Sequence, residues 1–359
     1  MAQVIDLFCG IGGLTHGLQL AGLKVVAGFD IDPTCKYAYE KNNKTKFIEA
    51  DVSELSAEAI ATHYSENGIR ILVGCAPCQP FSKYTMRYRK GEVRSEDNKD
   101  YGKWTLVESF AQKIKEILPE IISMENVPEL ANTDVFKNFL DTLVRLGYNV
   151  NLGIVFCPDY GVPQSRKRLV LLASTLGEIS LIPPLFTPDM YKTVKQAIGG
   201  MPEIKSGERH QEDNLHYCSE LSEINIKRIQ ASTERGTWRD WDESLQLECH
   251  KKDTGKSYPS VYGRMSWGSP SPTITTQFYG YGNGRFGHPE QDRALSIREG
   301  AILQSFPPDY KLLDEDSIVS TRILGKHIGN AVPVELGRAI GISIISHIRE
   351  VDANDANNG

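Results

Sequence analysis

The segment Val4-Ile-Asp-Leu-Phe-Cys-Gly-Ile-Gly-Gly-Leu14 lies near the start of a chain of 359 residues. A short apolar run leads into glycines and then into an amphipathic stretch, which predicts a strand, a tight turn and a helix. Glycines at such a turn let the backbone approach a ligand without a Cβ in the way. A dinucleotide-binding turn would have its third glycine at position 15, which is Thr15, so that fingerprint fails.

Strand-like and helix-like segments alternate as far as about residue 175. The expected strands are Val4–Phe8, Val25–Asp30, Phe47–Ala50, Ile69–Gly74, Ile121–Glu125, Asn149–Val155 and Leu169–Ser174. The expected helices are Leu14–Ala21, Pro33–Asn42, Leu55–His63, Leu106–Leu118 and Val135–Leu146. Strands and helices in turn predict an α/β fold with a doubly wound, mostly parallel sheet.

The regular spacing disappears after Leu176, and residues 183–286 are rich in proline, glycine, tryptophan and tyrosine. This composition predicts a second, smaller and irregular lobe. Regular patterning returns at Ser296–Leu303 and closes with an amphipathic helix over Val334–Ile348. The small, polar tail Asp352–Gly359 is expected to fray.

The charge balance is mildly acidic, with 40 Lys and Arg against 46 Asp and Glu and a net charge of −6. A polyanionic partner would therefore bind to local cationic patches. The sequence has no apolar run of about 18 residues and no basic-then-apolar leader, so we expect no membrane span and no signal peptide. The 7 cysteines are sparse and unpatterned, which favours reduced thiols in a cytoplasmic protein.

Acidic residues follow two of the expected strands. Asp30 is placed to accept hydrogen bonds from a ribose, and Ile31 offers an apolar face for a purine. Asp51, at the end of the third strand, could accept from an adenine amino group. These residues suggest an adenosine-containing ligand without a pyrophosphate, and S-adenosylmethionine fits that description. The alternative is a glycine-rich turn that serves only as a tight connection.

A cysteine pair follows the fourth strand in Gly74-Cys-Ala-Pro-Cys78-Gln-Pro-Phe-Ser82. It could be a thioredoxin-type redox pair, half of a zinc site, or two buried thiols. No second ligand pair at zinc spacing appears, and we expect no metal. Cys75–Lys103 forms a long, net-basic stretch without helix or strand spacing. It is a candidate active-site lid, with a solvated surface loop as the alternative.

Two further segments carry charged residues at strand ends. In Ser123-Met-Glu125-Asn126-Val127-Pro128 a carboxylate follows an apolar run, where partial desolvation would raise its pKa. The alternative is a capping or turn carboxylate. The segment Gln164-Ser-Arg166-Lys-Arg168 opens a strand and places two guanidinium groups on the same face of it. The alternative is that these charges only cover the edge of a strand.

Taken in order, these motifs resemble those of the DNA cytosine-5 methyltransferases. The matching segments are Asp6-Leu-Phe-Cys-Gly-Ile-Gly-Gly13, Pro77-Cys78-Gln79, Glu125-Asn126-Val127, Gln164-x-Arg166-x-Arg168, Ser271-Pro-Thr-Ile-Thr-Thr276, His288-Pro289, Arg298-Glu299 and Gly329-Asn-Ala-Val-Pro333. The resemblance covers essentially the whole chain. It departs from the family at Ala76, where proline or other residues are often seen, and at Asp30, where glutamate is more frequent.

The resemblance implies a role for each matching residue. Cys78 would be the nucleophile that adds to C6 of cytosine, and Glu125 the acid that contacts N3 and the exocyclic amine. Arg168 would contact O2, with Arg166 supporting the site or a phosphate, and both could favour the thiolate form of Cys78. The residues implied to bind S-adenosylmethionine are Phe8, Gly10, Ile11, Gly12, Asp30, Ile31, Asp51, Val52, Pro77, Asn330 and Val332.

The resemblance also implies an organisation and partners. The catalytic domain, with the S-adenosylmethionine-dependent methyltransferase fold, would be residues 1–186 plus 286–359, and the target-recognition domain residues 187–285. The substrate would be a cytosine flipped out of a specific double-stranded DNA sequence. Candidate DNA contacts in the recognition lobe are Arg209, Lys227, Arg228, Arg235, Arg239, Lys251, Lys252 and Arg264.

The compact length resembles the prokaryotic branch that serves restriction–modification systems. We therefore expect a monomer in a bacterial or archaeal cytoplasm, with a separate cognate restriction endonuclease as a candidate partner. The alternatives are the tRNA-methylating branch, whose Cys-Phe-Thr signature is missing, a catalytically silent DNA-binding module and a nicotinamide oxidoreductase. The intact set of Cys78, Glu125 and Arg168 argues against the silent module.

Overall fold

The computed structural model describes residues 2–77, 101–252, 258–314 and 320–358. Two compact units make up the chain. The sheet unit consists of Met1–Phe156, Lys167–Pro184 and Val332–Gly359. The second unit consists of Cys157–Arg166 and Leu185–Ala331. The predicted division into a catalytic domain and a target-recognition domain, with boundaries at residues 187 and 286, concerns function and stays a prediction. In the division of the chain into compact units, residues 286–331 belong to the irregular lobe.

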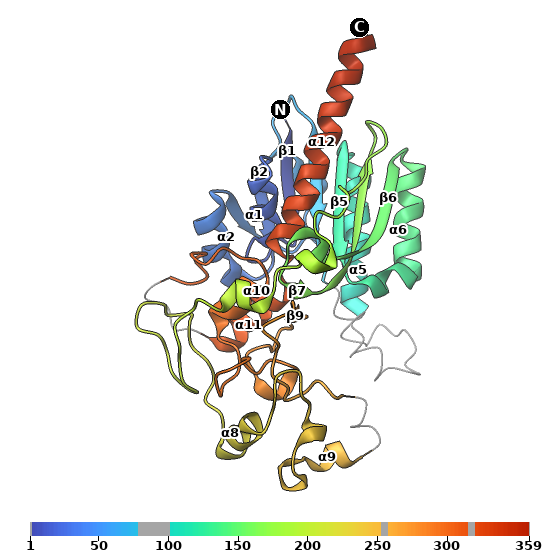
Figure 1. Ribbon diagram of the computed structural model, residues 1–359. Coiled ribbons are helices and arrows are strands. Elements are labelled where there is room, and N and C mark those ends of the chain that lie inside the picture. Colours follow the sequence, from blue (N-terminus) through green and yellow to red (C-terminus); the bar gives the residue numbers. More distant parts are fainter. Residues whose placement is uncertain (1, 78–100, 253–257, 315–319, 359) are drawn as a thin grey trace. The chain divides into compact units, whose positions relative to one another are not determined.

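The sheet unit is built on a seven-stranded sheet with the order β3-β2-β1-β4-β5-β8-β6 (Figure 1). The strands are β1 Gln3–Leu7, β2 Lys24–Asp30, β3 Lys46–Glu49, β4 Arg70–Gly74, β5 Ile121–Asn126, β6 Asn149–Phe156 and β8 Lys167–Ser174. Only β8 runs antiparallel to its neighbours β5 and β6. The predicted mostly parallel α/β sheet is confirmed, and every strand expected from the sequence is present.

Helices cover both faces of this sheet. They are α1 Gly13–Leu20, α2 Lys36–Asn43, α3 Ala57–Ala61, α5 Tyr101–Ile117, α6 Asp134–Arg145 and α12 Val334–Asn358. Phe110 of α5 and Phe139 of α6 stack in the core on one face, where β1 contributes Ile5 and Leu7. Because side chains alternate along a strand, Asp6 points to the opposite face. On that face Ser174 of β8 hydrogen-bonds His347 of α12 at 2.8 Å.

Two helices, α5 and α12, extend well beyond the ends that the sequence predicts for them. The stretch expected to be a loop up to Lys103 ends earlier, because α5 begins at Tyr101; residues 78–100 of that loop lie outside the described residues. The tail expected to fray continues as helix α12 to Asn358, and its last turns extend beyond the strands in Figure 1. Small residues such as those of this tail are compatible with a helix that is already nucleated upstream.

The C-terminal helices include one stretch, Thr321–Asn354, that is long and apolar enough to cross a membrane by length and composition. Of its most apolar window, 67% is buried within the structure. Core helices pass the same test, and α12 packs directly on α1. A Cβ added to Gly17 of α1 would lie 2.3 Å from the carbonyl oxygen of Val334. The two helices therefore touch backbone to backbone at this crossing.

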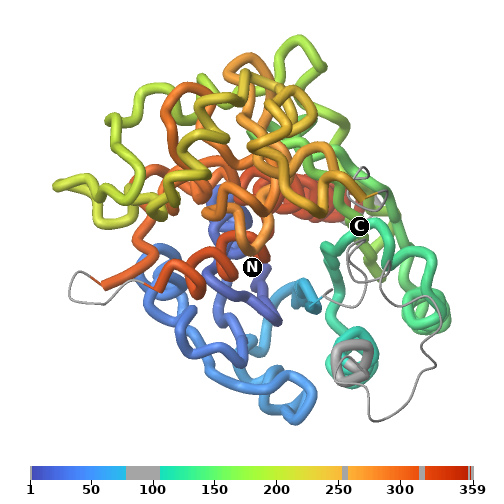
Figure 2. Tube along the Cα trace, turned by 90° about the horizontal axis from the view of Figure 1, so that it is seen from below, coloured from blue at the N-terminus to red at the C-terminus, as the bar shows by residue number. Residues whose placement is uncertain are grey.

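The second unit has little regular structure, and its trace in Figure 2 consists mainly of loops (yellow-green to orange). Its strands β7 Gln164–Ser165 and β9 Ser271–Pro272 form a short parallel pair. Its helices are α7 Val194–Ile198, α8 Glu223–Gln230, α9 Glu248–Lys251, α10 Ile297–Leu303 and α11 Thr321–Asn330. The irregular lobe expected from the sequence is thus seen, although it includes α10 and α11.

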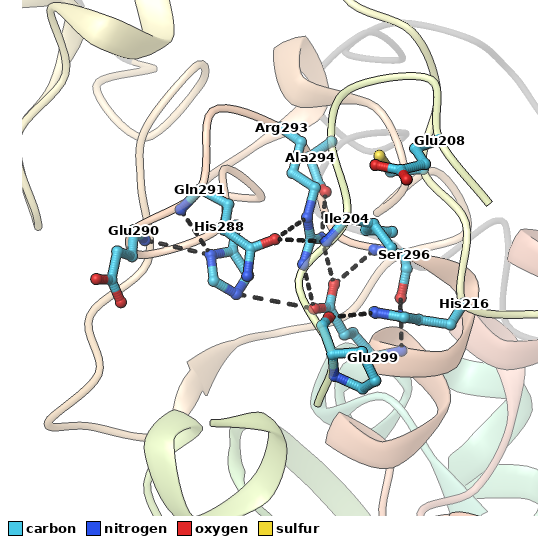
Figure 3. A network of polar contacts seen from close by, with 12 residues as sticks. Ile204, Glu208, His216, His288, Glu290, Gln291, Arg293, Ala294, Ser296 and Glu299 are labelled. Atoms are coloured by element: carbon cyan, nitrogen blue, oxygen red, sulfur yellow. Dashed lines mark hydrogen bonds and ion pairs between the residues drawn. The ribbon is translucent and has the colours of Figure 1, made fainter. Parts of the chain in front are cut away.

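A buried ion pair stabilises this loop-rich unit (Figure 3). Arg293 donates from Nη1 and Nη2 to the two carboxylate oxygens of Glu299 at 2.8 and 2.7 Å, and both side chains are fully buried. The backbone N–H of Ser296 donates to the same carboxylate at 2.7 Å. These contacts hold the pKa of Glu299 at about 2 against its burial. The backbone N–H of Gln291 donates to Nδ1 of His288, whose pKa burial lowers to about 4.

Substituting Gly17 by alanine should destabilise the protein by about 1–3 kcal/mol, because the added methyl has no room beside the α12 backbone. Gly153→Ala is the matched control in the sheet unit, since a Cβ there meets nothing within 4 Å. The free energy of unfolding in urea measures both. Equal stability of the two variants would contradict the backbone-to-backbone crossing.

Glu299→Gln should cost about 3–5 kcal/mol, because it leaves the Arg293 guanidinium buried without its counter-charge. Since the folded pKa values of Glu299 and His288 both lie below their unfolded values, stability should fall as the pH drops from about 6.5 towards 2. This loss should be smaller in Glu299→Gln. Urea unfolding across that pH range tests the prediction, with the exposed Glu290→Gln as a control expected to stay within about 0.5 kcal/mol. A Glu299→Gln variant as stable as the wild type would refute it.

Candidate active site

A buried carboxylate, Asp6 of β1, connects the end of this strand to the start of helix α1. The hydroxyl of Thr15 donates to Oδ2 of Asp6 at 2.6 Å and lies 3.1 Å from the hydroxyl of Tyr39. Burial raises the pKa of Asp6 to about 7. Thr15 stands where a dinucleotide-binding turn would have glycine, and here its side chain holds the start of α1 against the end of β1.

A second carboxylate, Asp30 at the end of β2, holds the glycine turn. Its Oδ2 accepts from the backbone N–H of Gly10 at 2.8 Å, and its Oδ1 accepts from that of Asp32 at 2.9 Å. The turn uses left-handed backbone at Phe8 (φ 62°), Gly10 (φ 51°) and Gly12 (φ 87°). Both oxygens of Asp30 are thus held by the backbone of the turn, which fixes the orientation of the carboxylate.

The surface beside this turn is open. A Cβ added to Gly10 would meet nothing within 4 Å, and Ile31 is 64% exposed, an unusual placement for a large apolar side chain directly after a buried strand. Asp51 follows β3, and its Oδ1 accepts from the backbone N–H and the hydroxyl of Ser53. Any ligand contact by Asp51 would therefore use Oδ2.

The remaining residues predicted to bind a methyl donor differ in accessibility. Ile11 and Val52 are each only 2% exposed and Val332 only 5%, so they can shape a site mainly through packing and backbone. Pro77 is exposed at the end of the described segment after β4. Asn330 is exposed at the end of α11 in the second unit, so the structure places it within that unit only.

Glu125, the second-to-last residue of β5, is buried next to a cation. Its side chain is 8% exposed, and its Oε1 lies 2.9 Å from Nε of Arg168 on β8. This contact is an ion pair without hydrogen-bond alignment, since Oε1 has no hydrogen-bond partner among the described residues. Nη1 of Arg168 donates to the carbonyl of Lys167 at 2.7 Å. Glu125 and Arg168 are thus brought together as the sequence motifs suggested.

Asn126 connects the ends of β4 and β5. It is 2% exposed, and its Nδ2 donates to the carbonyl of Ala76 at 3.0 Å. Its Oδ1 accepts from the backbone N–H of Val127 at 2.9 Å. The strand end that carries Glu125 is therefore fixed to the backbone two residues before Cys78. Cys78 itself lies outside the described residues, and its predicted role as nucleophile is not tested by the structure.

Arg166 is used inside the second unit. Its guanidinium donates to the carbonyls of Ile274 at 3.2 Å and Gly329 at 3.3 Å. The prediction that Arg166 supports the site is compatible with these contacts, because Gly329 directly precedes Asn330. A direct contact of Arg166 with substrate stays a prediction.

Two polar residues, Gln164 and Asn126, make buried hydrogen bonds between separate segments that the sequence reasoning did not predict. Gln164 is fully buried; its Nε2 donates to Oε1 of Gln304 at 2.8 Å, and its Oε1 accepts from the backbone N–H of Ile274 at 2.8 Å. Asn126 was noted only as part of a motif. Both lie next to residues that sequence reasoning did assign, Arg166 and Glu125, and that adjacency was the available signal.

Two of the predicted DNA contacts in the recognition lobe are wrong. Arg264 is 6% exposed and donates to the carbonyls of Ile229, Ser232, His288 and Gln291. Arg228 is 8% exposed and donates to the carbonyl of Leu245 at 2.8 Å. Both guanidiniums hold loops of the second unit together. The other candidates are exposed and stay predictions: Arg209, Lys227, Arg235, Arg239, Lys251 and Lys252.

The strand order, the glycine turn after β1, the carboxylate at the end of β2 and the buried acid near the end of β5 fit an α/β fold of the methyltransferase type. The sequence model of the C-5 cytosine-specific DNA methylases matches residues 2–346. The chain belongs to this family and is a DNA cytosine-5 methyltransferase.

Relatives in sequence agree with this assignment. The chain is 53% identical over 347 residues to the type II methylase M.HgiDII of Herpetosiphon aurantiacus, covering 96% of this chain and 95% of the relative. It is 31% identical over 364 residues to the type II methyltransferase M.Eco47II of Escherichia coli, covering 97% and 80%.

Solved structures at lower identity show the same fold. One, described as a DNA modification methyltransferase encoded within a prophage of E. coli, matches with a TM-score of 0.70 at 20% identity over 97% of this chain and 100% of its own. The Dnmt2 methyltransferase of S. pombe matches with a TM-score of 0.58 at 20% identity over 96% and 98%.

Asn126→Asp should lower methyl incorporation into DNA by at least about tenfold, because the lost donor releases the Ala76 carbonyl and small displacements of reacting groups are costly. The free energy of unfolding should fall by about 1–3 kcal/mol, the cost of leaving a buried acceptor unpaired. Asn149→Asp, on the exposed start of β6, is the matched control. Full activity of Asn126→Asp would show that the tie to Ala76 has no catalytic consequence.

Proposed function

We propose that this protein transfers a methyl group from S-adenosylmethionine to C5 of a flipped-out cytosine in a specific double-stranded DNA sequence, through a covalent bond between Cys78 and C6. The observation that carries the proposal is the buried Glu125, paired with Arg168 and fixed through Asn126 to the segment that leads into Cys78. A carboxyl group in that position is suited to a pyrimidine edge, and in the sequence Cys78 comes four residues after β4, the strand that pairs with β5.

The residues at the ends of β1, β2 and β3 fit a methyl donor that contains adenosine. Asp30, whose carboxylate is oriented by the turn, is the proposed acceptor for ribose hydroxyls, and the exposed face of Ile31 suits a purine ring. The open space at Gly10 lets a ligand approach the backbone of the turn. Asp51 would accept the adenine amino group through Oδ2. When bound, S-adenosylmethionine supplies a methyl group activated by the sulfonium charge.

The chemistry requires the thiol and the acid together, because C5 of cytosine is a weak nucleophile. Addition of the Cys78 thiolate to C6, with Glu125 hydrogen-bonded or donating a proton to N3, turns C5 into an enamine carbon. We assign the second oxygen of Glu125 to the exocyclic amine and Nη2 of Arg168 to O2. After methylation, loss of the C5 proton and cleavage of the C6–S bond release the product and the thiolate.

The attack at C6 needs the face of the ring, so the cytosine must leave the base stack, at a cost of a few kcal/mol. Double-stranded DNA is the proposed partner, with the basic stretch after Cys78 and the exposed cations of the second unit as the proposed phosphate contacts. The type II relatives of bacteria support a place in a restriction–modification system, acting on DNA in the cytoplasm. A separate endonuclease and a monomeric state are part of this proposal.

Cys78→Ser should abolish methyl transfer while binding of S-adenosylmethionine persists, because the thiol acts on the base and the donor is held elsewhere. Methyl incorporation into DNA and equilibrium dialysis of the donor measure the two activities. Asp30→Ala is the reciprocal variant, expected to weaken donor binding by at least about tenfold, as the loss of a charge-assisted hydrogen bond predicts. Normal turnover of Cys78→Ser would exclude the proposed nucleophile.

The covalent step has its own measurement. Bisulfite sequencing of DNA from cells that express the protein identifies the methylated sequence. A duplex with 5-fluorocytosine at that position should then trap the wild-type protein as a stable adduct, because the fluorine cannot leave as a proton does. Cys78→Ser should form no adduct. Turnover without any adduct on the fluorinated duplex would count against a covalent intermediate.

A further inference from the structure

Cys75 stands directly beside Glu125 on the sheet. β4 and β5 run parallel, and their last register pair is Gly74 and Met124. Cys75 and Glu125 each come one residue later, at the same level of the sheet. Met124 belongs to the core under α5 and α6. Since side chains alternate along a strand, Cys75 and Glu125 both point to the opposite face.

Among the described residues, Arg168 contacts the carboxylate of Glu125 through one of its two oxygens, Oε1. That contact, 2.9 Å from Nε to Oε1, lacks hydrogen-bond alignment, and Oε1 is buried without a hydrogen-bond partner in the described part of the chain. An ion pair of this kind attracts the carboxylate but does not fix its rotation. A second contact is needed if Glu125 is to present its oxygens to a base in one orientation.

The thiol of Cys75 is placed to supply that contact, because both the backbone and the carboxylate of Glu125 lie within its hydrogen-bonding reach. Burial raises the pKa of the Cys75 thiol well above its ordinary value, and the neighbouring charges of Glu125 and Asp6 raise it further. The thiol therefore remains protonated and can donate to the carboxylate. Cys75 is also a free thiol that is only partly exposed.

We propose that Cys75 is a positioning residue for Glu125: its S–H group donates to the carboxylate and, together with Arg168, fixes the orientation in which Glu125 meets the cytosine edge. This inference rests on the proposed function, since it requires Glu125 to contact the base. Cys75 is assigned no part in bond making. Its action is entirely through the carboxylate.

The alternative is that Cys75 only fills space between the strands. Serine and alanine separate the two possibilities, because serine keeps a donor at the same position and alanine does not. Cys75→Ala should lower kcat about tenfold with little change in KM for DNA, as expected when a reacting group is misoriented. Cys75→Ser should stay within about twofold of the wild type. The exposed Cys249→Ala and Cys249→Ser are the matched controls.

The rescue by serine gives a readout that packing alone would not produce, because alanine and serine fill nearly the same space and differ in the donor. Wild-type kcat in Cys75→Ala, or equal losses of kcat in both variants, would overturn the proposal.

Infrared spectroscopy tests the hydrogen bond without any assay of activity. The S–H stretching band of Cys75, isolated as the difference between wild type and Cys75→Ser, should lie at lower frequency than that of the exposed Cys249 thiol. In Glu125→Ala the Cys75 band should return to the frequency of a free thiol. A band that does not respond to Glu125→Ala would overturn the proposal even if Cys75→Ala failed to fold.

The same variants separate this inference from the proposed function. If Glu125→Ala retains full methyl transfer, the proposed function fails. If Glu125→Ala is inactive but Cys75→Ala behaves as the wild type, only the positioning role fails. With both roles present, the double variant Cys75→Ala/Glu125→Ala should be no less active than Glu125→Ala alone, because the thiol acts only through the carboxylate.

Discussion

A buried carboxylate at the end of a central strand is the constraint around which the catalytic side of this protein is arranged. Placing Glu125 where it is 7% exposed removes it from water, and a carboxylate in that position needs a cation or donors close by. Arg168 can provide the cation because β8 runs antiparallel beside β5 and its first residues lie next to the last residues of β5. The single reversed strand of the sheet thus brings the guanidinium to the acid.

The same physical need shapes the neighbouring turn. Asp6 and Asp30 lie near the ends of β1 and β2, and groups of the adjoining loop and helix bond to both: the Thr15 hydroxyl to Oδ2 of Asp6, and the Gly10 and Asp32 backbone to Asp30. The ligand side of the sheet is therefore preorganised by its own polar contacts. A ligand at Asp30 would find the carboxylate already oriented by the backbone.

The sequence was sufficient for the sheet, because short apolar runs separated by amphipathic stretches have few other solutions. It also singled out Glu125 and Arg168 as candidates, through the resemblance of the ordered motifs to a known family, and the structure places their side chains 2.9 Å apart. The parts it missed are of a different kind. The carbonyl partners of Arg264 come from four separate places in the chain, and no local pattern shows that a surface-type residue will be enclosed by loops.

Helix α12 illustrates the same limit at an end of the chain. The polar composition of Asp352–Gly359 suggested fraying, yet the helix continues to Asn358, because residues upstream are already helical and packed on α1. Propagation adds residues at little cost once a helix exists. Composition describes what a segment would do alone, whereas the structure shows what it does when joined to a packed helix.

The arginines of the second unit bear on how the protein can bind DNA. A lobe with few strands and helices has many backbone carbonyls without partners in a regular ladder, and burying them requires donors from side chains. A guanidinium has five donors in a fixed plane. Arg228 and Arg264 therefore donate hydrogen bonds to backbone carbonyls of loops, which in a β-sheet would be bonded by neighbouring strands. Arg293 is likewise committed to Glu299. These cations are not available to displace counterions from DNA, so among the described residues of this unit the salt dependence of binding would come from the exposed lysines and arginines.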